Sequence, residues 1–167
     1  MTDFLIINAR ILTLAGENSP RRKQEMNDLG VIELGHVLVK DGLIKHVGEG
    51  VPSEDLIGED EDLPIVDAYG RVLMPTFVDC HTHSCWAGSR LEEFEMGLRG
   101  VPYLEILQNG GGIMSTVRAV RESSQEELTI DLLGRLGLMT SLGTTSMEVK
   151  SGYGLTTKDE LKMLRAV

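Results

Sequence analysis

The side chains most able to do chemistry are gathered in one short stretch, Asp79-Cys80-His81-Thr82-His83-Ser84-Cys85. An apolar run leads into this stretch, so we expect a strand from Phe77 to His83. In a strand, residues i and i+2 point to the same face and lie about 6.6 Å apart along the chain. The imidazoles of His81 and His83 would therefore converge on one ion, at metal–nitrogen distances of about 2.0–2.1 Å. The pattern predicts half of a metal site.

Two other interpretations of the same stretch stay open on spacing alone. The histidines can be structural residues at a strand end that meet solvent or hydrogen-bond partners. Alternatively, a non-enzymatic zinc-binding module can use Cys80, His81, His83 and Cys85. Strand alternation opposes this module because Cys80 would point away from both histidines. With two cysteines in the chain, we expect reduced thiols rather than a disulfide framework.

Composition narrows the class of partner. The chain has 167 residues, 41% hydrophobic and 25% charged, which is typical of a globular protein. Its formal net charge of −10 opposes a broad electrostatic contact with nucleic acid or with an anionic membrane surface. No apolar run approaches the roughly 18 residues of a membrane span, and the start lacks the basic region of a secretory signal. We therefore expect a cytoplasmic protein that acts on a small molecule, without nucleic acid or membrane partners.

The elements that must position the histidines change in type near residue 73. Before it, short apolar runs predict strands, and Asp41-Gly42 between two of them predicts a tight hairpin. The first of these regions is expected to form one or two strands, broken near Asn8-Ala9-Arg10. The expected strands span residues 4–14, 37–40, 43–47, 65–68 and 72–74, and the expected loops span residues 16–28 and 54–62.

After residue 73 the spacing of apolar residues becomes helical between two strands, an order typical of α/β proteins. Leu128, Leu132, Leu136 and Met139 form one stripe of the longest expected helix. The last helix reaches Val167 without a cap, so we expect the N-terminal portion of a longer protein. The expected elements are helices at 111–121 and 124–142, a strand at 144–149, and a final helix from Thr157, with capping boxes at Ser124–Glu127 and Thr157–Glu160.

An apolar strand that ends in His-x-His, after a small β-rich region and before a second strand, resembles the start of the amidohydrolase superfamily of metal-dependent hydrolases. This strand and five further blocks make the resemblance specific to one family of that group, the imidazolonepropionases. The resemblance covers residues 73 to 167, whereas the first 72 residues match in style alone. The blocks are Phe77-Val78-Asp79-Cys80-His81-Thr82-His83, Ala87-Gly88-Ser89-Arg90, Tyr103-Leu104-Glu105-Ile106, Gly110-Gly111-Gly112-Ile113, Ser115-Thr116-Val117 and Glu148-Val149-Lys150-Ser151-Gly152-Tyr153-Gly154-Leu155.

The resemblance implies a fold and a reaction. Residues 73–167 would be the first part of a (β/α)₈ TIM-type barrel, and residues 1–72 a small β-sandwich-like region. His81 and His83 would bind a single zinc or iron ion, Arg90 the propionate carboxylate, and Tyr153 the substrate. The implied reaction is hydrolysis of 4-imidazolone-5-propanoate to N-formimidoyl-L-glutamate in histidine degradation, by a protein that is a homodimer when full length.

The resemblance also limits what these residues can do. The family takes its other metal ligands and its acid/base residue from later strands, so we expect no catalytic residue within this chain. Alone, it should bind metal weakly, lack activity and tend to aggregate. Another cyclic amide or imide hydrolase, or a deaminase, of the same superfamily stays open, as does an ion pair of Arg90 with Glu92 or Glu93.

Overall fold

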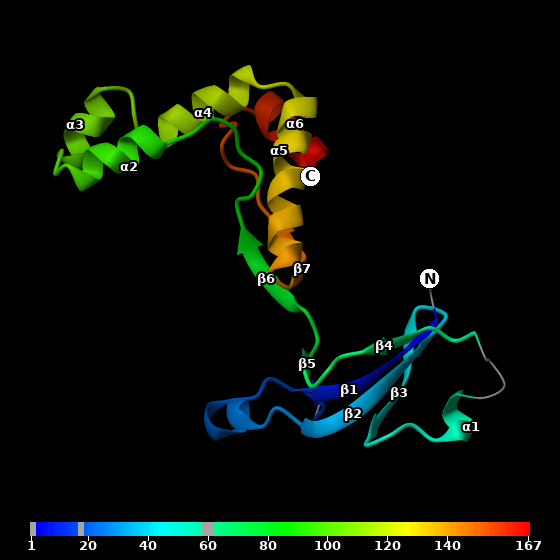
Figure 1. Cartoon of the computed structure of the whole chain (residues 1–167). Coiled ribbons are helices and arrows are strands. Elements are labelled where there is room, and N and C mark those ends of the chain that lie inside the picture. Colours follow the sequence, from blue (N-terminus) through cyan, green and yellow to red (C-terminus); the bar gives the residue numbers. More distant parts are fainter. Residues whose placement is uncertain (1–2, 17–18, 58–61) are drawn as a thin grey trace. The chain divides into compact units, whose positions relative to one another are not determined.

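The computed structural model describes residues 3–16, 19–57 and 62–167, and the chain divides into two compact units, 1–75 and 76–167 (Figure 1). The division lies three residues beyond the boundary expected after residue 72. The first unit is rich in strands, and the second combines strands with helices. The chain is therefore a mixed α/β protein.

The first unit is built on one five-stranded sheet in which β1 is central. It pairs antiparallel with β2 and parallel with β4 and β5, while β2 pairs antiparallel with β3. The described residues of this unit form a single sheet, so the second layer that a β-sandwich needs is not among them. The elements are β1 (Phe4–Leu12), the 3₁₀ helix η1 (Lys23–Asn27), β2 (Val31–Lys40), β3 (Leu43–Glu49), α1 (Glu54–Ile57), β4 (Ile65–Asp67) and β5 (Val72–Leu73).

Local backbone signals in this sheet are confirmed. The break expected near Asn8-Ala9-Arg10 is an irregularity inside one continuous strand: Asn8 has a positive φ of 55°, and the register shifts on both sides of Ala9. Asp41 and Gly42 have φ values of 54° and 72°, as the turn of a two-residue hairpin requires.

Two stretches expected as loops contain a helical turn. Residues 16–28 include η1, and residues 54–62 include α1. In α1, Leu56 and Ile57 pack against the cluster formed by Leu5, Leu38 and Leu63, and this contact fixes the turn despite the acidic residues around it. The rest of that acidic expectation, at 58–61, lies outside the described residues.

The second unit holds two parallel strands, β6 and β7, joined by a helical crossover (Figure 1). The crossover has four helices, two of which, α2 and α3, the periodicity did not reveal. No described helix is long and apolar enough to cross a membrane. The elements are β6 (Phe77–Thr82), α2 (Leu91–Leu98), α3 (Tyr103–Gln108), α4 (Ile113–Glu122), α5 (Gln125–Ser141), β7 (Thr144–Val149) and α6 (Thr157–Ala166).

The core of this unit forms where α4, α5 and α6 meet the segment after β6. Leu128 and Leu132, from the stripe expected on α5, are buried there, and Leu136 packs against them. Each fully buried leucine contributes roughly 1.5–3 kcal/mol to folding. Cys85 and Ala87 belong to the same cluster, so the chain just after His83 is anchored to the helices.

One of the two expected capping boxes is confirmed and the other is displaced. Ser124 Oγ accepts from the Glu127 N–H at 3.1 Å, and the Ser124 N–H donates to Glu127 Oε2 at 2.8 Å. The cap of α6 is Thr156, not Thr157, because its hydroxyl accepts from the Asp159 N–H. Glu160 instead accepts hydrogen bonds from the loop before the helix.

Candidate metal and substrate site

His81 is the next-to-last residue of β6, and His83 directly follows that strand. The pairing with β7 fixes their backbone, because the Lys150 N–H donates to the Thr82 carbonyl and the Thr82 hydroxyl donates to the Glu148 carbonyl, both at 2.8 Å. The two imidazole centroids are 5.4 Å apart, with their planes inclined by 49°. Both side chains are exposed.

This separation fits a shared ion. Two imidazoles that bind one ion at about 2.0–2.1 Å with a near-tetrahedral angle have ring centres about 5 Å apart. The donor type also suits zinc or iron, which imidazole nitrogens bind well. Across residues 3–16, 19–57 and 62–167, no group of three or more His, Cys, Asp and Glu side chains is placed to hold an ion. The pair would therefore supply two ligands of a larger set.

The cysteines do not join the histidines. Cys80 is exposed, whereas Cys85 is fully buried in the apolar core with Met163, and both are free thiols. Burial raises the pKa of Cys85, with a smaller opposing effect from Arg135. Because metals bind the thiolate, this environment disfavours the four-ligand zinc module.

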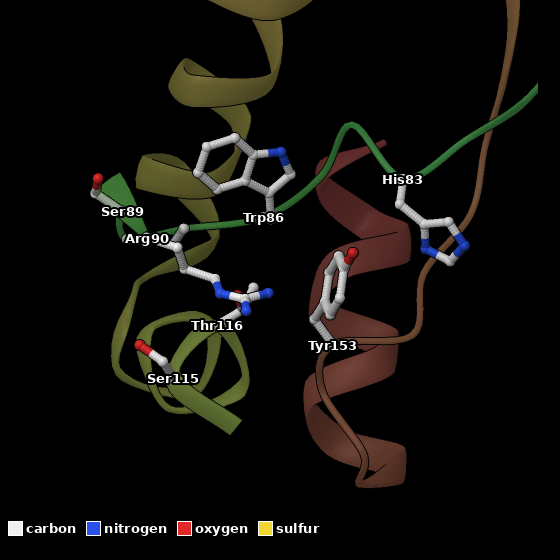
Figure 2. A pocket seen from close by; sticks show the side chains of 9 residues that line it. His83, Trp86, Ser89, Arg90, Ser115, Thr116 and Tyr153 are labelled. Carbon is white, nitrogen blue, oxygen red and sulfur yellow. The ribbon is translucent and has the colours of Figure 1, made fainter. Parts of the chain in front are cut away.

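A pocket of about 260 Å³ opens beside His83. Its volume is close to the lower end of the roughly 300–1,000 Å³ usual for small-molecule sites. Figure 2 shows Arg90 and Tyr153 on its walls together with Trp86, Ser115 and Thr116. The pocket thus brings together three residues that the sequence selected from separate segments: His83, Arg90 and Tyr153.

Tyr153 lies between His83 and Arg90 in the view of Figure 2. Its ring centroid is 5.6 Å from that of His83, and the side chain is half-buried. Its loop is fixed by Arg121, whose Nε donates to the Gly154 carbonyl at 2.8 Å. Gly154 itself lies so close to α6 that a Cβ would come within 2.5 Å of the Glu160 nitrogen, so only glycine fits there.

Arg90 forms an ion pair with Glu93, one of the two partners that we considered for it from the sequence. Its Nε and Nη2 lie 3.0 and 2.7 Å from Glu93 Oε2, and the hydrogen bond to Glu93 raises the pKa of Arg90 further. Glu93 also accepts from the Gly112 N–H at 3.0 Å, which fixes the carboxylate in turn. The arginine side chain is still 46% exposed, so the ion pair leaves the guanidinium accessible from the pocket.

Residues that the sequence did not select support the walls of the pocket. Arg135 lies 3.6 Å from the centre of the Trp86 ring and donates to the Ser84 and Trp86 carbonyls at 3.0 and 2.8 Å. In the sequence, the one sign of this role is that Arg135 is a charged residue next to Leu136 of the apolar stripe of α5.

Lys150, directly after β7, forms an ion pair with Glu148 at 2.8 Å.

No protein-family model matches this chain. Curated relatives match it along nearly all its length. An imidazolonepropionase from Symbiobacterium thermophilum is 47% identical over 169 aligned positions, which cover 99% of this chain and 39% of the relative. One from Alkaliphilus metalliredigens is 43% identical and covers 100% of this chain and 40% of the relative. The chain spans about two fifths of the length of these relatives.

Solved structures share the fold at lower identity. A prolidase in complex with N-methylphosphonate-L-proline is 17% identical with a TM-score of 0.57, over 90% of this chain and 26% of that chain. A 5-methylcytosine deaminase from Klebsiella pneumoniae with phosphonocytosine is 21% identical with a TM-score of 0.58, over 98% of this chain and 32% of that chain.

The chain therefore shares the fold of the corresponding parts of these two enzymes. In sequence, the chain is homologous along its whole length to part of an imidazolonepropionase. This homology confirms the resemblance drawn from the motifs and corrects its extent, because the first 72 residues belong to the match as well.

Proposed function

We propose that this chain is part of an imidazolonepropionase, which hydrolyses 4-imidazolone-5-propanoate to N-formimidoyl-L-glutamate. One observation carries the proposal: His83, Arg90 and Tyr153 line a single pocket, with His81 next to His83. An imidazole pair, a guanidinium and a phenol around one small pocket suit a polar heterocycle with a carboxylate tail.

His81 and His83 would hold one zinc or iron ion. When bound, such an ion would lower the pKa of its water toward about 7 and polarise the amide carbonyl. The strand pairing around Thr82 keeps both imidazoles directed to the same end of the sheet. The remaining metal ligands and the acid/base residue would come from outside these 167 residues.

Arg90 and Tyr153 would orient the substrate. A guanidinium binds a carboxylate through two parallel charge-assisted hydrogen bonds, so Arg90 suits the propionate group. Glu93 holds the guanidinium from one side and leaves another side for the substrate. Because Tyr153 lies beside His83, it would contact the ring of the substrate while Arg90 holds the tail. Binding of the distant tail then places the reacting carbonyl near the metal.

The rest of the protein would complete the fold around these strands. We infer that β6 and β7 are the first two strands of a (β/α)₈ barrel in residues 73–167, with the histidines at its carboxyl-terminal face, where barrel enzymes keep their active sites. Exposed apolar side chains on β6 support this inference, since Phe77 is 56% and Val78 72% exposed. Further strands and helices would cover them.

The test is the kinetics of the complete protein with Arg90→Ala. We expect kcat/KM for 4-imidazolone-5-propanoate to fall about 10- to 100-fold, since hydrogen bonds to charged groups contribute roughly 1.5–3 kcal/mol. Arg90→Lys should restore part of the loss. Arg99→Ala, on the exposed Arg99–Glu95 pair of α2, is the matched control and should change little. Unchanged turnover in Arg90→Ala would instead favour another cyclic amide hydrolase or a deaminase.

A further inference from the structure

The first unit contains a second pair of histidines, remote in sequence from the pocket. His36 on β2 and His46 on β3 have ring centroids 5.3 Å apart and planes inclined by 19°. In the register of the two strands, His36 is opposite Gly48 and His46 is opposite Leu38. The histidines are therefore diagonal neighbours on the same face of an antiparallel pair.

The hydrogen bond of His36 fixes its tautomer. His36 is 4% exposed, and its Nδ1 lies 3.0 Å from the Gly50 carbonyl oxygen. A carbonyl can only accept, so Nδ1 carries the proton, and in the neutral ring Nε2 then keeps a free lone pair. A backbone carbonyl on the outer nitrogen is the arrangement that orients histidines bound to metals.

Gly48 lies close to both Nε2 atoms. A Cβ at this position would lie 2.6 Å from His36 Nε2 and 2.7 Å from His46 Nε2. Among the described residues, Gly48 is not one of those with a positive φ, so the backbone conformation does not demand glycine there. The close approach of the two imidazoles does, and it places both Nε2 atoms on the same side of Gly48.

We propose that His36 and His46 bind a divalent transition-metal ion, Zn²⁺ in the first instance, through their Nε2 atoms. The centroid separation is close to the about 5 Å expected of two imidazoles on one ion, and imidazole nitrogens suit Zn²⁺. The sheet fixes the relative position of the two rings, and the net charge of −10 favours the approach of a cation. Water would occupy the other positions, since among the described residues no third His, Cys, Asp or Glu joins the pair.

The test uses the complete protein with His81→Ala and His83→Ala, so that the proposed catalytic half-site cannot contribute. Titration with ZnCl₂ is followed by calorimetry and by the side-chain nitrogen resonances of the histidines. We expect one ion per chain, with shifts at Nε2 of His36 and His46 and retention of the Nδ1 proton of His36. These outcomes are independent of whether the proposed enzymatic function is correct.

A matched variant separates metal binding from simple ring stacking. His46→Phe preserves an aromatic ring beside His36 but removes one ligand, and we expect at least a tenfold loss of Zn²⁺ affinity. Gly48→Ala should lower the affinity as well, because its Cβ would come within 2.7 Å of both nitrogens and displace the imidazoles. His46→Asn provides a second ligand-poor variant should the phenyl ring disturb folding. Absence of saturable binding in the parent, or equal affinity in His46→Phe, would overturn the proposal.

Discussion

The carboxylate of Glu160 in α6 accepts a hydrogen bond from the Gly154 N–H at 2.8 Å, and the same oxygen accepts from the Leu155 N–H at 2.7 Å. Gly154 follows Tyr153 directly, so a residue on the helix holds the loop that presents the tyrosine. Arg121 holds the same loop through the Gly154 carbonyl. Both backbone groups of Gly154 are thus bonded to side chains, which restricts where Tyr153 can lie.

Replacement of Glu160 by Gln should loosen this loop. Hydrogen bonds to a charged acceptor contribute roughly 1.5–3 kcal/mol, about twice those to a neutral one. We expect amide hydrogen exchange at Gly154 and Leu155 to accelerate about tenfold in Glu160→Gln. Glu122→Gln, at the exposed end of α4, is the control and should leave the exchange of both amides unchanged. Equal protection in the two variants would show that the carboxylate does not order the loop.

Stability should fall in acid. Burial alone would raise the pKa of Glu160, but hydrogen bonds from the Leu155 N–H and its neighbours outweigh it and lower the pKa. Hydrogen bonds from Ser124 and Thr156 likewise lower the pKa values of Glu127 and Asp159. A carboxyl with a lowered folded pKa stabilises the fold fully above its unfolded value, about 4.3 for Glu, and loses that contribution as pH falls through the folded pKa.

Urea unfolding followed by circular dichroism between pH 7 and pH 2 measures this dependence. The unfolding free energy of unit 76–167 should be level near neutrality and decline below about pH 4.5. Glu160→Gln should flatten part of the decline, because one of the contributing carboxylates is gone. A stability that rises as pH falls through this range would contradict the stated directions of these pKa shifts.

The cap of α6 can be located by a pair of alanine variants. Thr156→Ala removes the hydroxyl that accepts from the Asp159 N–H and should cost about 1 kcal/mol of unfolding free energy. Thr157→Ala lies one residue inside the helix and should cost little. Thermal unfolding of both variants under the same conditions distinguishes them. A larger loss in Thr157→Ala would place the cap where the sequence pattern first suggested it.

The displaced cap illustrates what local pattern can and cannot specify. Thr156 and Asp159 satisfy the same three-residue spacing as Thr157 and Glu160, so the sequence alone permits either cap. The structure selects the first because Glu160 is engaged by Gly154 and Leu155. By contrast, the Asp41-Gly42 hairpin was predictable, since the positive φ angles at the turn are a local requirement.

Part of the candidate site likewise follows from local geometry, and part depends on tertiary structure. His81 and His83 are two residues apart in a strand, so their proximity follows from local geometry. That Arg90 and Tyr153 reach the same pocket depends on how four helices return the chain from β6 to β7, which spacing does not encode. Family resemblance supplied those two residues. Their supports, such as Arg135, became visible through tertiary contacts alone.

Arg135 lies against Trp86, the single tryptophan of the chain, so its effect on this part of the pocket can be measured by fluorescence. Arg135→Met preserves much of the apolar stem but removes the guanidinium that holds the Ser84 and Trp86 carbonyls. We expect a loss of about 1–3 kcal/mol in unfolding free energy and greater quenching of tryptophan fluorescence by acrylamide. Arg165→Met, on the exposed side of α6, is the matched control and should leave Trp86 as protected as before. If both variants quench alike, Arg135 does not position the segment between His83 and Arg90, and the wall of the pocket must be held by the buried contacts of Cys85 and Ala87.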